Sequence, residues 1–372
     1  MSKTGTILFV GGGSGGHIAP LLAVLEAVQR KEPAVSCCYA GLKSDLESPL
    51  ITGSTLRFEK YSLPAGKLNR FMTWRHLTEA GKMVSGMVAA NRLIRRLKPD
   101  VLLAKGGFVG VNAAIAARRA GIPIYCHESD VIPGLANRFV AGLARRVFTT
   151  YPERYYHNLP QSKLRAVGQP VRSAFFNPAA LPVALLGREV STAWPVLTVI
   201  GGSQGAARIN RLAEGMWRDA LEETQIIHIT GKREFTRLRE AAQKLPGQLA
   251  DRLFLVEFPV DELPAIFQAS TVIISRAGST IAEVAAACKP LILLPLSTAA
   301  QDHQTANARV LADTGAAVVL DETNTDSFQL WNETRQILTS PEAREKLSAA
   351  IVAFANPEAA DRMADELLEE LK

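Results

Sequence analysis

The sequence contains few of the residues that build metal centres and disulfide frameworks. It has four cysteines and six histidines among 372 residues, and Cys37, Cys38, Cys126 and Cys288 show no metal-ligand spacing. Most of them lie in apolar runs, which is typical of reduced, structural thiols in the cytoplasm. We therefore expect neither a metal ion nor a cofactor.

Long apolar runs are also missing. No uninterrupted run reaches the roughly 18 residues that a membrane-spanning helix needs, because the most apolar region, Ile281–Leu296, is broken by Glu283, Lys289 and two prolines. The start of the chain shows no signal-peptide pattern. The composition, 47% apolar and 21% charged, is typical of a soluble globular protein, and the length suits two domains.

Acidic residues are scarce in the first part of the chain. Residues 1–166 contain 23 Lys and Arg against 10 Asp and Glu, whereas the remainder contains 19 against 26. The excess is greatest in Arg57–Lys98, where bulky apolar residues are interleaved with ten basic ones. Such a segment can lie on an anionic membrane. An ordinary amphipathic helix fits the pattern too, and nucleic acid is a third alternative, although no binding module for it is visible.

Glycine is concentrated in two turns. Gly11–His17 and Gly201–Gly205 follow the apolar runs Ile7–Val10 and Val196–Ile200, and each leads into a helix-like stretch. A strand, a glycine turn and a helix N-terminus together form a site where backbone N–H groups receive a phosphate or another anion. The repeated unit predicts two Rossmann-like halves that face a shared cleft.

Strand and helix patterns alternate along the chain, which predicts an α/β fold with parallel sheets covered on both faces. The predicted strands are Ile7–Val10, Val35–Ala40, Val101–Ala104, Ile122–Cys126 and Arg146–Thr149 in the first half, and Val196–Ile200, Gln225–Thr230, Leu253–Glu257, Val272–Ser275, Leu291–Pro295 and Ala317–Leu320 in the second. Helices are predicted at Ala80–Leu97, Val111–Arg119 and Leu135–Leu143. We divide the chain into residues 1–167 and 168–356, with Gly168–Trp194 as the linker.

The first glycine turn also fits the dinucleotide-binding pattern G-x-G-x-x-G. That fingerprint needs an acidic residue at the end of the second strand, where it binds the ribose of the cofactor. The run Tyr39–Lys43 contains no acid, and Asp45 follows two residues later. The pattern therefore argues against a nicotinamide enzyme.

His17 stands where the first helix is predicted to begin. The helix dipole lowers its pKa there and favours the neutral imidazole, which is the form that a general base requires. A histidine that only caps its own turn is the alternative. Because the flanking glycines give a ligand close access to the backbone, we interpret His17 as catalytic.

Polar groups also follow later strands. Lys105–Gly110 contains a third glycine pair, and His127–Asp130 follows the predicted strand Ile122–Cys126. The run His127–Asp130 has no D-x-D pair and no His/Glu cluster at the spacing of metal ligands, so it does not support a metal-bridged diphosphate. If a diphosphate is the leaving group of the reaction, helix dipoles and arginine must neutralise its charge.

Two runs of the second half suit a sugar nucleotide. Ser275–Glu283 places Glu283 in a first helical turn, where a carboxylate can bond a ribose diol. Asp302–Asn307 carries amides, which pair bidentately with vicinal hydroxyls.

The order of these motifs resembles that of the MurG family of peptidoglycan glycosyltransferases. The resemblance covers nearly the whole chain, through Gly11–Pro20, Lys105–Asn112, His127–Arg138, Gly168–Arg172, Gly201–Ala206, Ser275–Glu283 and Asp302–Asn307. It implies a GT-B fold whose final helix, about Pro357–Lys372, returns to the first domain. It also implies an inverting, metal-independent transfer of N-acetylglucosamine (GlcNAc) from UDP-GlcNAc to the C4 hydroxyl of the lipid-linked muramyl-pentapeptide (lipid I), giving lipid II.

The resemblance assigns roles to residues of this chain. His17 would be the base, with Glu128 nearby. The acceptor would be held by Gly13, Ser14, Gly15, Gly16, Gly106, Gly107 and Asn137. UDP-GlcNAc would be held by Arg172, Ser203, Gln204, Gly205, Phe258, Val260, Ser279, Thr280, Glu283, Gln304 and Asn307. The segment Arg57–Lys98 would contact the anionic membrane surface at its cytoplasmic face, and no nucleic acid is implied.

Three positions differ from the family pattern. Asn112 stands where the family usually has proline, the run 278–283 is one residue shorter, and the run 258–263 is one residue longer. Two rival functions remain open: another lipid glycosyltransferase of this fold, with a diacylglycerol or a different polyprenyl diphosphate as acceptor, and a UDP-sugar epimerase. A non-catalytic membrane-anchoring subunit would explain the basic segment, but it would not need the nucleotide and sugar motifs of the second half.

Overall fold

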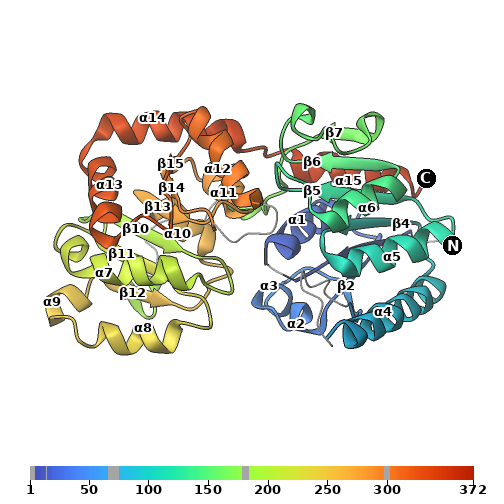
Figure 1. Ribbon diagram of the computed structural model, residues 1–372, viewed down its shortest axis with the longest axis horizontal. Helices are drawn as coiled ribbons and strands as arrows, with labels where there is room; N and C mark the ends of the chain where they lie inside the picture. The colour runs from blue at the N-terminus through green and yellow to red at the C-terminus, as the bar shows by residue number, and fades with distance from the viewer. Residues whose placement is uncertain (1–4, 14, 66–74, 178–183, 297–301) are drawn as a thin grey trace. The chain divides into compact units, whose positions relative to one another are not determined.

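The computed structural model describes residues 5–13, 15–65, 75–177, 184–296 and 302–372, which form two compact units. The first unit comprises Met1–Arg172 and Pro357–Lys372, and the second comprises Ser173–Asn356. Each unit contains a parallel sheet with helices packed on it, as predicted (Figure 1). The division between the units falls five residues after the one placed on the sequence, so that Gly168–Arg172 belong to the first unit.

The first unit is built on a seven-stranded parallel sheet of order β3-β2-β1-β4-β5-β6-β7. Its strands are β1 (Thr6–Gly11), β2 (Ser36–Gly41), β3 (Glu59–Ser62), β4 (Val101–Lys105), β5 (Ile124–Glu128), β6 (Arg146–Thr149) and β7 (Leu164–Ala166). The central strands are continuous apolar runs, and their residues are buried, as a sheet covered on both faces requires. Strand order reverses between β1 and β4, so this pair marks the topological switch point.

Helices cover both faces of this sheet. They are α1 (Gly15–Lys31), α2 (Lys43–Leu46), α3 (Pro49–Thr52), α4 (Arg75–Leu97), α5 (Gly107–Arg119), α6 (Leu135–Leu143) and α15 (Ala359–Glu369). The crossover through α1 runs from β1 toward one edge, and those through α5 and α6 run toward the other. Right-handed crossovers therefore place α1 on one face and α4, α5 and α6 together on the opposite face.

The final helix α15 completes the first unit by packing beside α1. Its apolar side, including Met363 and Leu367, is buried. Its acidic side meets cations from α1 and from the strand edge: Arg30 with Asp361, Lys31 with Asp365 at 2.7 Å, and Arg145 with Glu370 at 2.9 Å. The acidic C-terminal segment thus offsets part of the positive charge of residues 1–166.

The second unit repeats this design in a six-stranded parallel sheet of order β12-β11-β10-β13-β14-β15. Its strands are β10 (Val196–Ile200), β11 (Gln225–Ile229), β12 (Leu253–Val256), β13 (Val272–Ser275), β14 (Leu291–Leu293) and β15 (Val318–Val319). All six were predicted, with ends that differ by at most two residues. The switch point lies between β10 and β13.

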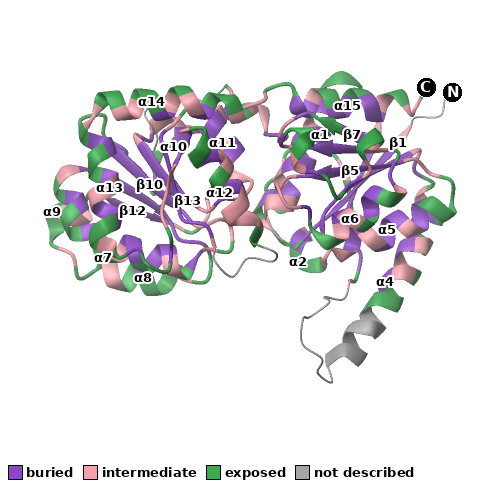
Figure 2. Cartoon of the chain, turned by 45° about the horizontal axis from the view of Figure 1, so that its top comes forward, coloured by how far each residue is buried: buried purple, intermediate pink, exposed green. Residues whose placement is uncertain are grey.

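The helices of the second unit are α7 (Ala207–Glu223), α8 (Phe235–Ala242), α9 (Gly247–Ala250), α10 (Leu263–Ala269), α11 (Thr280–Ala286), α12 (His303–Asp313), α13 (Ser327–Thr339) and α14 (Pro341–Ile351). A cluster that includes Trp217, Leu330 and Trp331 joins α7 and α13 over one face of the sheet. Asp326 starts α13 with a capping box, accepting from the Gln329 N–H at 2.7 Å. Figure 2 shows the strands of both sheets buried and the outer helix faces exposed.

The predicted linker Gly168–Trp194 has more structure than its composition indicated. Gly168–Arg172 pack on the first unit, and Ala184–Leu185 (β8) pairs antiparallel with Arg188–Glu189 (β9) in a hairpin. Leu186 and Gly187 form its two-residue turn at φ 54° and 73°, which suits a primed turn. Among the described residues no helix combines the length and apolarity needed to cross a membrane.

Candidate functional site

Two glycine turns of the first unit meet at its switch point. One follows β1 and the other follows β4, and the strands pair so that Gly11 lies opposite Lys105. Ligands of open parallel sheets bind outside the carboxyl ends of the strands at this point. Gly106 and Gly107 have φ of 63° and 70°, a conformation that glycine adopts without strain.

His17 lies in the first turn of α1, with its ring against the second glycine turn. A Cβ added to Gly106 would be 2.7 Å from His17 Nε2, so a larger residue there would displace the imidazole. His17 Nδ1 lies 2.7 Å from the Gly12 carbonyl oxygen, which can only accept. Nδ1 therefore carries the hydrogen, and Nε2 of the neutral ring is left as a proton acceptor.

The electrostatics of His17 also favour the neutral ring. Its pKa is lowered below the usual 6.5, first by burial and also by the positive charge of Lys105. The sequence predicted the direction from the helix dipole, whereas burial is the main cause. The bond to Gly12 shows that His17 caps its own turn, and the same bond orients Nε2 as a base requires.

Asp45 gives the first glycine turn an internal partner that the sequence analysis dismissed. Its carboxylate accepts from the Gly13 N–H at 2.9 Å and from the Leu42 N–H at 2.8 Å, and it is buried. It lies so close to Gly12 that a Cβ there would be 1.9 Å from an Asp45 oxygen. The Gly13 N–H is therefore already bonded in this structure. Ser14, expected at the acceptor, lies outside the described residues.

Asn137 connects the second glycine turn to Glu128. Its Oδ1 accepts from the Gly106 N–H at 3.0 Å, and its Nδ2 donates to the His127 carbonyl at 3.1 Å and to Glu128 Oε2 at 2.9 Å. The side chain is buried. In this structure Asn137 thus holds the turn against which His17 packs, and its polar atoms bond to protein groups.

Glu128 is a buried carboxylate held by several donors. Besides Asn137, it accepts from the Asp130 N–H at 2.9 Å and the Gly134 N–H at 3.1 Å. Burial is the first cause that raises its pKa to about 7, followed by the negative charge of Asp130. The group can therefore change protonation near neutral pH.

Lys105 is a buried cation that was not among the predicted site residues. Its side chain is 1% exposed, and its Nζ lies 2.7 Å from His127 Nδ1. Burial lowers its pKa to about 8, while the nearby carboxylates of Glu128 and Asp130 act in the opposite direction. A lysine at the end of an otherwise apolar buried strand was the signal available in the sequence.

The third glycine turn lies at the switch point of the second unit, after β10. Gly205 donates its N–H to the Gly202 carbonyl at 2.9 Å and packs on Thr230, where a Cβ would be 2.3 Å from the carbonyl oxygen. The helix α7 begins after this turn and has no side-chain cap. Its first N–H groups and the positive end of its dipole are suited to an anion. Ser203 is half-buried and Gln204 exposed.

A cavity of about 520 Å³ opens beside this turn, within the size range of small-molecule sites. It is lined by Gly201, Gly205, Ala206, Ala207, Arg208, Arg276, Leu296, Gln304, Glu322 and Thr323. Its residues come from the turn after β10 and the start of α7, from the segments after β13 and β14, from the start of α12, and from the turn after β15. Two of the predicted donor residues, Gly205 and Gln304, therefore line one cavity.

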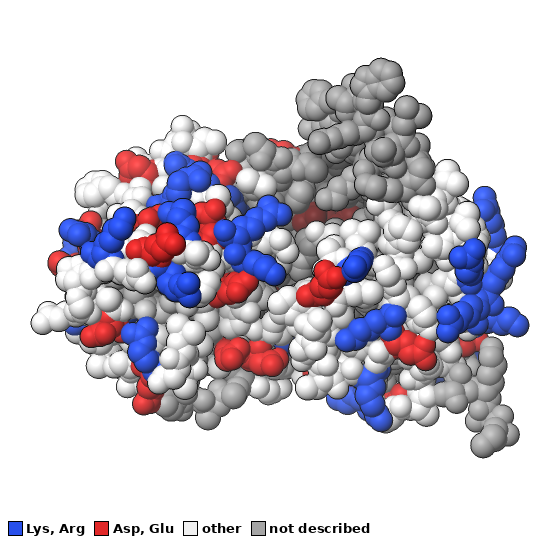
Figure 3. Space-filling model, turned by 90° about the horizontal axis from the view of Figure 1, so that it is seen from below, with Lys and Arg blue, Asp and Glu red and all other residues white. Residues whose placement is uncertain are grey.

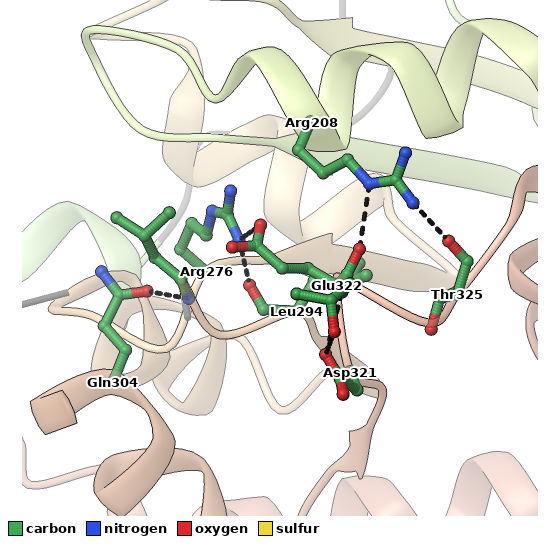
Figure 4. A network of polar contacts seen from close by, with 9 residues as sticks. Arg208, Arg276, Leu294, Gln304, Asp321, Glu322 and Thr325 are labelled. Atoms are coloured by element: carbon green, nitrogen blue, oxygen red, sulfur yellow. Dashed lines mark hydrogen bonds and ion pairs between the residues drawn. The ribbon is translucent and has the colours of Figure 1, made fainter. Parts of the chain in front are cut away.

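Charged groups that the sequence analysis did not single out stand in this cavity (Figure 4). Arg276 Nη1 lies 2.5 Å from Glu322 Oε2, and both side chains are largely buried. Arg208 donates to the Glu322 backbone carbonyl at 2.9 Å. Nothing in sequence spacing joins Glu322 to Arg276, because 46 residues separate them.

The other predicted donor residues lie around this cavity and along the same sheet edge. Gln304 Oε1 accepts from the Leu296 N–H at 2.9 Å, and Asn307 is buried, donating to the Ala277 carbonyl at 3.0 Å. Half-buried positions at or after strand ends complete the set: Phe258 and Val260 after β12, Ser279 and Thr280 at the start of α11, and Glu283 in its first turn. Arg172 is half-buried and ends the N-terminal segment of the first unit.

The described residues contain no group of three or more His, Cys, Asp or Glu placed to hold a metal ion. In each unit, the polar groups meet at the carboxyl end of the sheet. The first unit thus has a buried acid-base cluster, and the second has an anion-suited cavity.

Comparison with known proteins identifies the family. Residues 7–149 match the glycosyltransferase family 28 N-terminal domain, and residues 196–363 match the family 28 C-terminal domain. The chain is 33% identical over 335 residues to the UDP-N-acetylglucosamine–N-acetylmuramyl-(pentapeptide) pyrophosphoryl-undecaprenol N-acetylglucosamine transferase of Shouchella clausii, covering 89% of this chain and 90% of that protein. The chain belongs to glycosyltransferase family 28. This confirms the resemblance that the order of motifs indicated.

Solved structures confirm the fold without separating its functions. The crystal structure of MurG from Acinetobacter baumannii superposes with a TM-score of 0.69 at 23% identity, covering 98% of this chain and 99% of that one. A UDP-GlcNAc 2-epimerase from Neisseria meningitidis, solved with UDP-GlcNAc, also reaches 0.69 at 16% identity, with coverage of 98% and 100%. Family 28 membership therefore rests on sequence, and the GT-B fold on both comparisons.

The bonds of Asn137 generate a prediction about stability. Asn137→Ala should lower the free energy of unfolding by about 3 kcal/mol, because it leaves the buried Gly106 N–H and a Glu128 oxygen without a partner. Asn112→Ala is a matched control, since Asn112 is equally buried but its Nδ2 has no hydrogen-bond partner among the described residues. That control should lose no more than about 1 kcal/mol.

Urea titration of both variants, followed by circular dichroism, measures the difference. Equal losses in the two variants would show that packing, and not the bonds of Asn137, stabilises this part of the first unit.

Proposed function

We propose that this protein transfers GlcNAc from UDP-GlcNAc to the C4 hydroxyl of lipid I, producing lipid II for peptidoglycan. The observation that carries this proposal is the 33% identity to a named transferase of that reaction over 90% of its length, with both family 28 domains matched. Supply of lipid II would connect the protein to cell-wall growth, cell shape and division.

His17 is the base in this proposal. Nε2 takes the proton as the C4 oxygen attacks the anomeric carbon, the bond from that carbon to UDP breaks, and the configuration inverts. The bond from Nδ1 to Gly12 holds the ring for this role and disperses the charge that forms on it. Asn137 links Glu128 to the same turn, and Glu128 lies near the positive charge of Lys105. In this proposal, the charge of Glu128 affects how readily His17 accepts the proton.

The acceptor binds at the glycine turns of the first unit. Gly15 and Gly16 open α1, and Gly106 and Gly107 open α5, so two helix N-termini are available to the lipid diphosphate. The Gly13 N–H already donates to the carboxylate of Asp45. The lipid diphosphate therefore binds to other N–H donors of these turns and is attracted by the positive charge of Lys105.

The donor binds in the second unit. Ser203, Gln204 and the start of α7 hold the diphosphate, and their partial positive charge stabilises departing UDP. The uracil lies near Phe258 and Val260. Around it, Ser279, Thr280 and Glu283 take the ribose. Gln304 and Asn307 contact GlcNAc after rearranging the bonds that they make here.

Two rivals remain to be tested. One is an epimerase, a class of enzyme that needs no acceptor, and the epimerase of the same TM-score was solved with UDP-GlcNAc. The other is a related transferase that uses a different lipid. UDP release from UDP-GlcNAc, measured with and without a short-chain lipid I analogue, should increase at least tenfold with the analogue and yield a disaccharide of the expected mass. Release that ignores the analogue would contradict the proposal, as would transfer to diacylglycerol alone.

The pKa shifts separate two candidate bases. Since burial holds the pKa of His17 below 6.5, kcat/KM should stay level as pH falls to about 6.5 and decline only below it. His17→Ala should lower kcat by 10²-fold or more and remove this decline. A decline centred near pH 7, retained in the His17 variant and absent from Glu128→Gln, would identify Glu128 as the base.

We also propose that α4 holds the protein on the cytoplasmic face of the membrane. Of its described side chains, Val84 and Val88 are 66% and 51% exposed, and Arg92 and Arg95 continue the same helical face. Figure 3 shows Lys and Arg on both units, interleaved with acidic side chains on the left and forming a group at the right-hand end, in the first unit. Exposed apolar groups beside cations suit an anionic lipid surface. Residues 66–74 of the predicted segment lie outside the described residues.

Binding to lipid vesicles tests this surface. Replacing Arg92 and Arg95 with Gln should weaken sedimentation with phosphatidylglycerol vesicles about 30-fold, at roughly 1 kcal/mol per cation. The matched control replaces Arg118 and Arg119, two exposed cations at the end of α5, with Gln. Equal loss in the two variants would show that general charge, and not α4, drives binding.

A further inference from the structure

The cavity of the second unit contains a carboxylate where an anion is expected to bind. Arg276 follows β13, and its Nη1 donates to the Leu294 carbonyl at 2.8 Å and to Glu322 Oε2 at 2.5 Å. The side chains of Arg276 and Glu322 are 12% and 7% exposed. Among the described residues, Nε and Nη2 of Arg276 have no hydrogen-bond partner, so the guanidinium retains donors for a ligand (Figure 4).

The turn that carries Glu322 is fixed from both sides. Arg208, from the first turn of α7, donates to the backbone carbonyls of Glu322 at 2.9 Å and Thr325 at 2.8 Å. Asp321 accepts from the Thr323 N–H and from Asn324 Nδ2, both at 2.8 Å. The turn that carries Glu322 is thus bonded to α7, the helix whose N-terminus is suited to an anion. These bonds place the Glu322 carboxylate in the cavity.

The position of Glu322 beside Arg276 affects the binding of an anion in this cavity. A largely buried guanidinium is costly without a counter-ion, and Glu322 supplies one while the cavity holds no ligand. The same cavity is lined by Gly205 and the start of α7, whose dipole favours an anion. Once an anion enters, it and Glu322 compete for one cation, and like charges in a partly buried site repel.

We propose that Glu322 is an internal counter-ion of the donor site, which the diphosphate of UDP must displace from Arg276. This inference rests on the proposed function, because it takes the anion to be the diphosphate of a nucleotide sugar. Glu322 then keeps Arg276 ordered in the empty cavity, lowers the affinity for UDP, and helps UDP to leave after transfer.

Isothermal titration with UDP and, separately, with inorganic pyrophosphate tests the proposal. Glu322→Gln keeps the shape and an acceptor for Arg276 but removes the charge, so both anions should bind about tenfold more tightly. Glu214→Gln is the matched control: it also removes one negative charge from an arginine pair of this unit, with Arg237 at 2.7 Å, away from the cavity. It should leave both affinities within about twofold.

A second variant decides the matter if Glu322→Gln does not fold. Replacing both members, Arg276→Met with Glu322→Gln, removes the buried pair, which folds usually tolerate. The attraction of pyrophosphate to Arg276 and its repulsion by Glu322 are then both removed, so pyrophosphate affinity should stay within about threefold of wild type. Affinity at least tenfold weaker in the double variant would overturn the proposal, as would unchanged or weaker binding in Glu322→Gln.

Failure of the proposed function gives a different result. If the wild-type protein binds pyrophosphate but not UDP, the nucleotide-sugar function fails, and the response of pyrophosphate binding to Glu322→Gln still decides the counter-ion. Binding of neither anion would overturn both.

Discussion

The parallel pairing of β1 with β4, and of β10 with β13, is the constraint on which both candidate sites depend. Register places Gly11 opposite Lys105 in the first unit and Ile200 opposite Ser275 in the second. Because parallel strands end at the same edge, each pairing brings together two turns that are distant in sequence. A slip of one residue would separate the Gly106 backbone from the His17 ring and reverse the side chains of each strand.

The strands that form these pairings could be predicted because a strand buried on both faces is a continuous run of apolar residues. Edge elements escape that signal. The strand β3 has the sequence Glu-Lys-Tyr-Ser and is mostly exposed, so it was hidden in the basic segment Arg57–Lys98. The short β7 and the β8–β9 hairpin likewise owe their order to tertiary neighbours, which no local pattern records.

Recognition of the site was partial for a related reason. Glycine turns and His17 are visible because their chemistry is local, whereas Asp45, Lys105 and Glu322 act through partners 32, 22 and 46 residues away. Each is a charged residue buried by long-range contacts. The nearest sequence signal is a single charge at the end of an apolar strand, and most such charges face solvent.

The two units use buried charge in different ways. In the first, burial lowers the pKa of Lys105 to about 8 and raises the pKa of Glu128 to about 7, so both groups can change protonation near neutral pH. In the second, Arg276 is always charged, so only the identity of its counter-ion can change. This contrast would suit the proposed glycosyl transfer, with proton movement at the proposed acceptor site and exchange of a diphosphate at the proposed donor site. The same parallel fold can serve both purposes. Its switch point determines where charged groups are buried, and the residues of the turns determine which charges these are.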